Sequence, residues 1–130
     1  MLNPEQMKLK VLVIDDVPSA RRVVRRLLEK IGFADVEECA NGKIAFERLQ
    51  SGEFGIIISD WNMPDMSGLE LVQKVRDTES LSKIPFLMIT STAQKEEVVT
   101  AVKSGVSEFV VNPFSLETLT LKLEHILKIS

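Results

Sequence analysis

The sequence has a single cysteine and no surplus of positive charge. Cys39 alone excludes a disulfide within the chain, and it is best interpreted as a small packed residue in a reducing compartment. Lysine and arginine number 16 against 19 aspartates and glutamates, which gives a net charge of -3. This balance argues against binding to nucleic acid or to an anionic membrane, because both need a basic surface.

Long apolar runs are also missing. No run approaches the roughly 18 apolar residues of a membrane span, and the opening MLNPEQMKLK lacks the apolar stretch of a signal peptide. Low-complexity tracts, linkers and internal repeats are absent as well. We therefore expect a cytoplasmic protein that does not use a membrane.

Length and hydrophobic content favour one domain. The chain has 130 residues, of which 45% are hydrophobic, enough for a real core and too many for a disordered chain. The last predicted helix reaches the end of the sequence. We expect a single monomeric domain over residues 1–130, with no output domain attached.

Two kinds of segment alternate along the chain. Short apolar runs, typical of strands buried on both faces, lie at 9–14, 35–39, 55–59, 84–90 and 108–111. Stretches with helical spacing follow them, at 19–31, 42–50, 68–76, 94–104 and 116–128. Five repeats of strand and helix predict an α/β fold, a doubly wound parallel sheet of five strands with five helices.

Polar side chains follow four of the predicted strands. Asp15 and Asp16 come after the first, Asp60 after the third, Thr90 after the fourth and Asn112 after the fifth. They should converge, because ligands of such sheets bind outside the carboxyl ends of the strands. Three crowded carboxylates repel one another unless a cation is present, and Mg²⁺ prefers oxygen ligands. The pattern predicts a magnesium site.

A carboxylate at such a site can be a nucleophile toward phosphorus. The Asp15–Asp16 pair suits metal binding, directly or through water, which leaves Asp60 as the phosphoryl acceptor. The Thr90 hydroxyl could donate a hydrogen bond to the new phosphoryl group. A plainer explanation stays open for Asp16, which precedes Pro18 and could cap the following helix.

The chain resembles the response-regulator receiver domains over about residues 9–128. Four motifs carry the resemblance jointly: VLVIDD at 11–16, SDWNMPDMSGLELVQKVR at 59–76, FLMITS at 86–91 and EFVVNPF at 108–114. The resemblance implies a flavodoxin-like sheet of order 2-1-3-4-5. It also implies a phosphorylation-switched two-component protein rather than an enzyme, since a receiver promotes only its own phosphorylation and dephosphorylation.

The resemblance assigns roles to individual residues. Asp15, Asp16 and Asp60 would bind Mg²⁺ together with the backbone carbonyl of Asn62. Asp60 would be phosphorylated by a histidine kinase or by a small phosphodonor.

The switch is assigned in the same way. Thr90 and Phe109 would form a two-state element, with Phe109 replacing a more usual tyrosine. A separate downstream partner would bind the surface made by the fourth helix, the last strand and the last helix. The flagellar motor switch, in chemotaxis, is the partner best suited to a receiver without an output domain.

Asn112 departs from the family pattern, which has a lysine at this position before the proline. An amide brings no charge, so part of the electrostatic clamp on the phosphoryl group is missing. Lys95 is the one candidate substitute. A degenerate receiver, acting as a phosphate sink or a constitutive adaptor, is therefore the alternative. The resemblance also implies a cis Asn112–Pro113 bond.

Two further classes fit less well. An aspartate-nucleophile phosphatase needs a second acid where this chain has Asn62. A flavin-binding module of similar fold would place Asp15 and Asp16 against the flavin phosphate, which they would repel.

Other polar features have plain explanations or surface roles. His125 has no metal-ligand partners and is predicted to lie on the surface. Trp61 should line the edge of the site and report on it. The first helix carries a basic cluster, interpreted either as a solvated face or as a docking surface for an acidic phosphodonor protein: Arg21, Arg22, Arg25 and Arg26.

Overall fold

One parallel sheet organises the molecule. The computed structural model describes residues 1–91 and 94–128. Five strands lie in the order β2-β1-β3-β4-β5, and every neighbouring pair is parallel. Their bounds are β1 Val11–Ile14, β2 Val36–Cys39, β3 Ile56–Asp60, β4 Phe86–Thr90 and β5 Glu108–Val111. The predicted α/β fold and strand order are confirmed.

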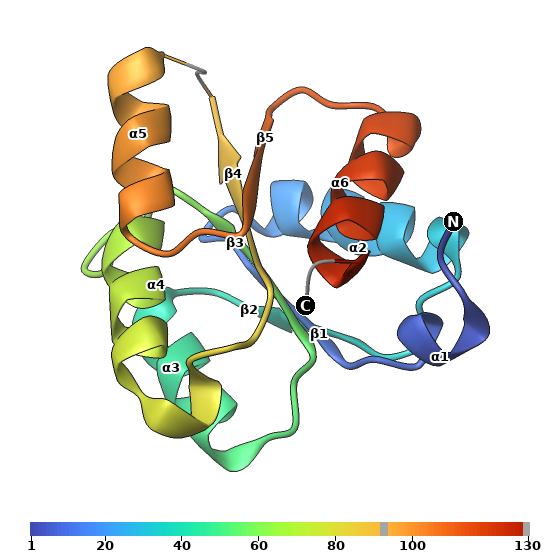
Figure 1. Cartoon of the computed structure of the whole chain (residues 1–130), viewed down its shortest axis with the longest axis horizontal. Helices are drawn as coiled ribbons and strands as arrows, with labels where there is room; N and C mark the ends of the chain where they lie inside the picture. Colours follow the sequence, from blue (N-terminus) through green and yellow to red (C-terminus); the bar gives the residue numbers. More distant parts are fainter. Residues whose placement is uncertain (92–93, 129–130) are drawn as a thin grey trace.

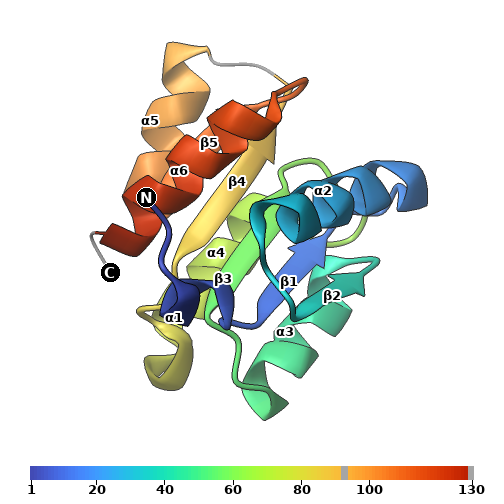
Figure 2. The same cartoon turned by 90° about the vertical axis from the view of Figure 1, so that its right-hand side faces the viewer.

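Helices cover both faces of the sheet (Figure 1). Over the described residues the helices are α1 Pro4–Met7, α2 Pro18–Ile31, α3 Gly42–Ser51, α4 Gly68–Asp77, α5 Lys95–Lys103 and α6 Leu116–Lys128, with a short 3-10 turn η1 at Glu79–Leu81. Figure 2 shows the strands running side by side between the two helical layers.

Alternation along each strand divides the core in two. Leu12 and Ile14 point to the face covered by α3, α4 and α5, whereas Val11 and Val13 point to the face covered by α2 and α6. All four side chains are almost completely buried. Strands with both faces covered must be apolar throughout, which is why they appear in the sequence as continuous apolar runs.

Helix α1 was not expected. Asn3 caps its first turn, accepting a hydrogen bond from the Gln6 N–H while the Gln6 side chain accepts one from the Asn3 N–H. Leu2 beside it is buried in the core that α2 and α6 share with the sheet. The segment is too short to show helical periodicity, so only its capping residues could have indicated it.

The other elements lie within one or two residues of their predicted ends. The fourth strand begins at Phe86, because Pro85 has no N–H to donate to the ladder. The third strand includes Asp60 as its last residue, so this side chain belongs to the sheet and not to the loop after it. Cys39 is buried, with its thiol directed at the Asn41 carbonyl, as the packed interpretation predicts.

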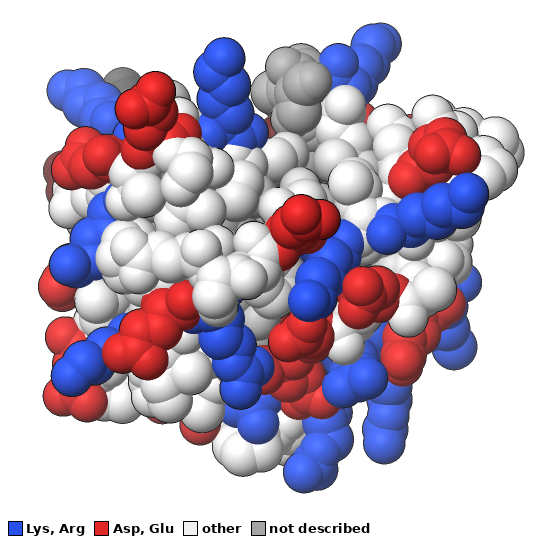
Figure 3. Space-filling view, turned by 90° about the horizontal axis from the view of Figure 1, so that it is seen from below, with Lys and Arg blue, Asp and Glu red and all other residues white. Residues whose placement is uncertain are grey.

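The surface carries both signs of charge. Figure 3 shows basic and acidic side chains interspersed on the face seen from below in Figure 1. Within residues 1–91 and 94–128, none of the helices has the length and apolar character needed to cross a bilayer.

Candidate functional site

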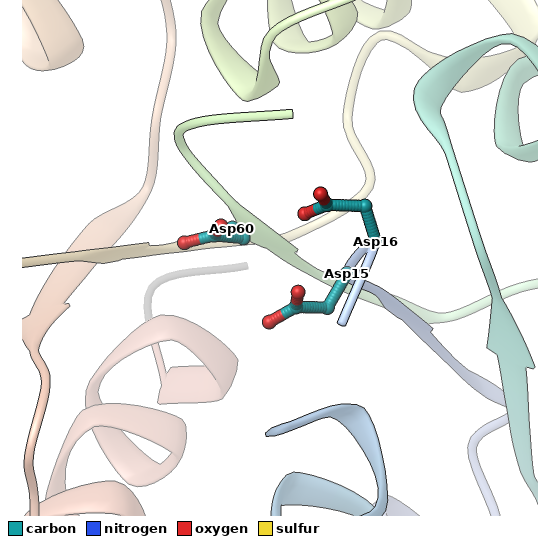
Figure 4. Close-up of side chains that lie close together, drawn as sticks. All are labelled: Asp15, Asp16 and Asp60. Carbon is teal, nitrogen blue, oxygen red and sulfur yellow. The ribbon is translucent and has the colours of Figure 1, made fainter. Parts of the chain in front are cut away.

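Three carboxylates meet at the carboxyl ends of two neighbouring strands. Asp15 and Asp16 follow β1, and Asp60 ends β3 beside it (Figure 4). Ile14 pairs with Ser59, so the register places Asp15 level with Asp60. One carboxylate oxygen from each of the three residues lies within 4.8 Å of the others. The structure therefore brings together the three residues predicted to bind a metal.

The three carboxylates of the cluster repel one another. Burial raises the pKa of Asp60 to about 6, the charge of Asp15 adds to this, a hydrogen bond from the Trp61 N–H opposes it, and Asp16 contributes a further rise. Burial also raises the pKa of Asp15, against a hydrogen bond from the Val17 N–H at 2.9 Å. Such a site fits a hard divalent cation, because its oxygen ligands are negative, close together and partly shielded from water.

The capping explanation for Asp16 is wrong. Helix α2 begins at Pro18, and its N-cap is Val17, whose apolar side chain makes no capping hydrogen bond. The Val17 N–H instead donates to Asp15. Asp16 is exposed at the cluster, which leaves its carboxylate available to a ligand.

Thr90 and Asn112 lie at the same edge of the sheet. Asp60 pairs with Ile89, which places Thr90 one residue beyond Asp60 on the next strand. The Asn112 N–H donates to the Thr90 carbonyl at 2.8 Å, and Thr90 itself is buried. The Asn112–Pro113 bond is cis, as the resemblance implied.

The surroundings of Asn112 are open. Asn112 is exposed, and a pocket of about 200 Å³ lies between it and Asp15, with walls from α2 and from Phe114. Asn62, the predicted source of a backbone ligand, is exposed two residues after Asp60. The side chain of Lys95, the candidate substitute cation, lies outside the part of the chain that the structure describes.

Phe109 lies on β5 in a half-buried position. The Lys122 ammonium lies 5.1 Å from the centre of its ring. Glu108 on β5 lies 3.3 Å from this lysine and 3.0 Å from His125, so an ion pair between β5 and α6 lies beside the predicted switch residue. His125 is half exposed, which confirms its predicted surface position.

The basic cluster of α2 does not form one solvated face. Arg22 and Arg26 are exposed, as predicted. Arg21 and Arg25 instead bond to Glu38 on β2, at 2.9 and 3.1 Å. Helical spacing could not show this, because Glu38 reaches the helix only through the pairing of β2 with β1.

Two small residues that sequence reasoning did not assign to the site shape the backbone at Asp60. A Cβ on Gly68 would clash with the Asp60 carbonyl oxygen, and the Gly68 N–H donates to the Trp61 carbonyl at 2.8 Å. The buried Ser59 hydroxyl donates to the Asp60 carbonyl at 2.9 Å. A glycine at the first position of a helix was the only sequence signal of this close approach.

The sheet order and the acidic cluster define a class of protein. Residues 11–124 match the response regulator receiver domain family, and the chain belongs to that family. It is 42% identical over 120 residues to "Chemotaxis protein CheY1" of Helicobacter pylori. The matched region covers 92% of this chain and 97% of that protein. It is 39% identical over 118 residues to "Chemotaxis protein CheY-3" of Vibrio cholerae serotype O1, with 91% of each chain covered.

Solved structures agree with this assignment. The chemotaxis response regulator CheY4 of Vibrio cholerae has a TM-score of 0.85 and 36% identity, over 92% of this chain and 98% of that one. The receiver domain of a signal transduction histidine kinase from Syntrophus aciditrophicus has a TM-score of 0.83 and 26% identity, over 92% and 90%. The resemblance noted from the four motifs is therefore confirmed.

Proposed function

We propose that this receiver domain is a phosphorylation-switched signalling protein of a two-component system, in which Asp60 accepts the phosphoryl group. The observation that carries the proposal is the cluster of three carboxylates within 4.8 Å at the ends of β1 and β3. Asp15, Asp16, Asp60 and the backbone carbonyl of Asn62 would hold Mg²⁺ there. The bound ion would neutralise charge on the phosphoryl oxygens.

The chemistry of the chain itself is a single displacement. An oxygen of the ionised Asp60 carboxylate attacks the phosphorus of a phosphohistidine on a histidine kinase. The new O–P bond forms as the N–P bond breaks, and the imidazole leaves with the electron pair and takes up a proton from water. The product on the receiver is an acyl phosphate, so the protein changes its own state and is not an enzyme with a separate substrate.

Phosphorylation would change the positions of residues on β4, the strand next to β3, and on β5 beyond it. The Thr90 hydroxyl would donate to the phosphoryl group, and Phe109 would move between an inward and an outward position. Phe109 packs partly against the core and lies beside Lys122 of α6, while Val99 and Val102 of α5 and Leu121 of α6 are exposed apolar residues. A separate protein partner would bind the surface made by α5, β5 and α6.

The named relatives support a role in chemotaxis. This chain covers 91% to 97% of the two chemotaxis proteins, so the likeness extends over nearly all of each. We propose that it acts as a cytoplasmic monomer between a histidine kinase and a downstream protein, with the flagellar motor switch as the target. Its net charge of -3 supports a protein partner over nucleic acid or a membrane.

One observation favours a second function. Asn112 is exposed and uncharged at the position where the family has a lysine, and it lies beside an open pocket. Without that charge the phosphorylated state would be coupled less strongly to the α5–β5–α6 surface. The domain would then serve as a phosphate sink or a constitutive adaptor.

One experiment tests the primary function. The protein is incubated with Mg²⁺ and either beryllium fluoride or acetyl phosphate, and Trp61 fluorescence and intact mass are followed. We expect a fluorescence change with either reagent and, with acetyl phosphate, the added mass of one phosphoryl group, both abolished by Asp60→Asn. An unchanged spectrum and mass at millimolar donor would contradict the proposal.

Asn112→Lys separates the two functions. The added cation should strengthen the effect of phosphorylation on partner binding, because it restores a charge beside the phosphoryl group. If partner binding depends on phosphorylation equally in both proteins, Asn112 does not limit the switch, and the sink interpretation loses its support.

A further inference from the structure

Arg21 connects three parts of the chain at the edge of the acidic cluster. Its Nε donates to Glu38 Oε1 at 2.9 Å, and its Nη1 donates to the backbone carbonyl of Asp15 at 2.8 Å. Only 16% of the Arg21 side chain is exposed. One guanidinium thus joins helix α2, strand β2 and the turn that follows β1.

The carbonyl that Arg21 holds belongs to the peptide between Asp15 and Asp16. Successive side chains of an extended strand point to opposite faces of a sheet. Two adjacent carboxylates can therefore reach the same ion only if the backbone turns between them. The bond from Arg21 restrains that peptide, and the bond from the Val17 N–H to Asp15 Oδ1 restrains the side chain.

Arg21 is itself held in place by its surroundings. Glu38 accepts from Arg21 with one carboxylate oxygen and from Arg25 with the other, at 3.1 Å. Arg48 of α3 donates to the Glu38 backbone carbonyl at 2.8 Å. Burial alone would raise the pKa of Glu38, but the bonds from Arg21 and Arg25 lower it, so Glu38 stays ionised. Because the Arg21 guanidinium is already bonded on two sides, its side chain loses little further conformational entropy when an ion binds to the cluster.

We propose that Arg21 is a positioning residue of the acidic site. It fixes the turn after β1 so that the carboxylates of Asp15 and Asp16 face Asp60 together before any ion arrives. Arg21 does not touch the metal or the phosphoryl group. Its link to metal binding rests on the proposed function, whereas its control of the turn does not.

The test compares Arg21→Met with Arg25→Met, in two measurements. Arg21 and Arg25 lie on the same helix, α2, and each guanidinium bonds to Glu38. Only Arg21 also bonds to Asp15. Outer-shell partners of metal ligands typically contribute 10- to 100-fold to metal affinity. We expect Arg21→Met to weaken Mg²⁺ binding about 10-fold or more, measured by Trp61 fluorescence and by calorimetry, while Arg25→Met leaves it unchanged.

The second measurement needs no metal. Amide hydrogen exchange at Val17 in chelator should be faster in Arg21→Met than in wild type and in Arg25→Met, because the turn is released. Equal exchange in all three proteins would overturn the inference. A thermal melt of each variant separates this local effect from a general loss of stability.

The outcomes distinguish the two proposals. If wild type fails to bind Mg²⁺, the proposed function fails, and Val17 exchange still decides the role of Arg21. If wild type binds and both methionine variants bind equally well, only the inference fails. Should Arg21→Met not fold, Arg21→Lys replaces it: a single ammonium cannot keep both partners of the fork, so Mg²⁺ affinity should again fall.

Discussion

Asp60 shows at the scale of one residue how position determines chemistry. The side chain is half-buried beside Asp15, and its pKa rises from an ordinary 3.8 to about 6. Near neutral pH the metal-free protein therefore carries an ionised group in surroundings that disfavour the charge. A cation that binds beside Asp60 would remove this unfavourable electrostatic free energy, and its binding would be strengthened accordingly.

The raised pKa predicts a pH-dependent effect of Asp60→Asn on stability. The stability that a raised carboxyl pKa provides is fully present below about pH 3.8 and is lost as the pH rises through about 6. In chelator at about pH 7.5, Asp60→Asn should raise the free energy of unfolding by about 1–3 kcal/mol, allowing for partial solvent screening. The gain should shrink as the pH falls from 6 toward 4. Urea unfolding at several pH values measures it.

Asp65→Asn is the matched control. Asp65 is exposed in the same loop, and its left-handed backbone, φ 69°, also suits asparagine. It should have almost no effect at either pH. An equal gain in both variants would mean that net charge, and not the cluster, causes the effect.

The residues of the site were predictable where their position along the chain alone brings them to the end of a strand. Asp15, Asp16 and Asp60 each stand at the end of an apolar run, and strand ends converge in any parallel sheet. The partners of Arg21 and Arg25 were not predictable, because Glu38 comes within reach only when β2 pairs with β1. Side-chain contacts between elements depend on register, which one sequence does not show.

At the scale of elements, the connection from β3 to α4 packs closely against the backbone of Asp60. The loop leaves Asp60, returns at Gly68 and starts a helix there, with Ser67 accepting from the Glu70 N–H. Gly68 lies against the Asp60 backbone and the Met88 sulfur, so there is no room for a side chain.

Gly68→Ala should therefore cost about 1–3 kcal/mol of stability, because rigid backbone must move to admit the Cβ. The same movement should weaken Mg²⁺ binding. Gly42→Ala is the control: it is also the first residue of a helix after a capping side chain, but its nearest neighbour is the flexible Met66 side chain at 3.1 Å. We expect that variant to lie within about 1 kcal/mol of wild type. Similar losses in both variants in urea unfolding would contradict the account.

Most element types followed from periodicity, and their ends followed less well. Strand β3 runs one residue further than predicted, because Asp60 keeps the ladder partner Ile89 on β4. Helix α1 escaped prediction because four residues show no helical period, although Asn3 and Gln6 form a capping pair.

At the scale of the whole molecule, Arg76 joins segments that are distant in sequence. Its guanidinium donates to the carbonyls of Gly105, Ser82 and Ile84, at 2.8, 3.1 and 2.7 Å. It also donates to the Ser107 hydroxyl at 3.3 Å. Burial lowers its pKa, but an arginine remains charged. The end of α4 is thereby fastened to the loops before β4 and β5.

Arg76→Met should lower the free energy of unfolding by roughly 2–4 kcal/mol, since three carbonyls lose a charged donor. Arg22→Met, which removes an exposed arginine from α2, should change it by less than about 0.5 kcal/mol. Urea unfolding gives both values. Because Arg76 does not contact the acidic cluster, Mg²⁺ affinity should be the same in both variants, and a large loss of affinity in Arg76→Met would contradict this separation.

The architecture as a whole was the most predictable level. Alternating strands and helices allow few arrangements, since crossovers between parallel strands are right-handed and buried strands must be apolar. The order β2-β1-β3-β4-β5 needed the family resemblance, because alternation alone does not say which strand lies at the centre.

The crowding of three carboxylates also ties occupancy of the site to the folding equilibrium. An ion that binds only the assembled cluster stabilises the folded chain by an amount that grows with its concentration, about 2.7 kcal/mol at a hundred times its dissociation constant. The unfolded chain has no comparable site, because the pairing of β1 with β3 is what brings Asp15 and Asp60 together. Mg²⁺ bound there as proposed would make the melting temperature of this protein a measure of free magnesium, and the chelated and metal-bound forms should differ in how readily a protease degrades them.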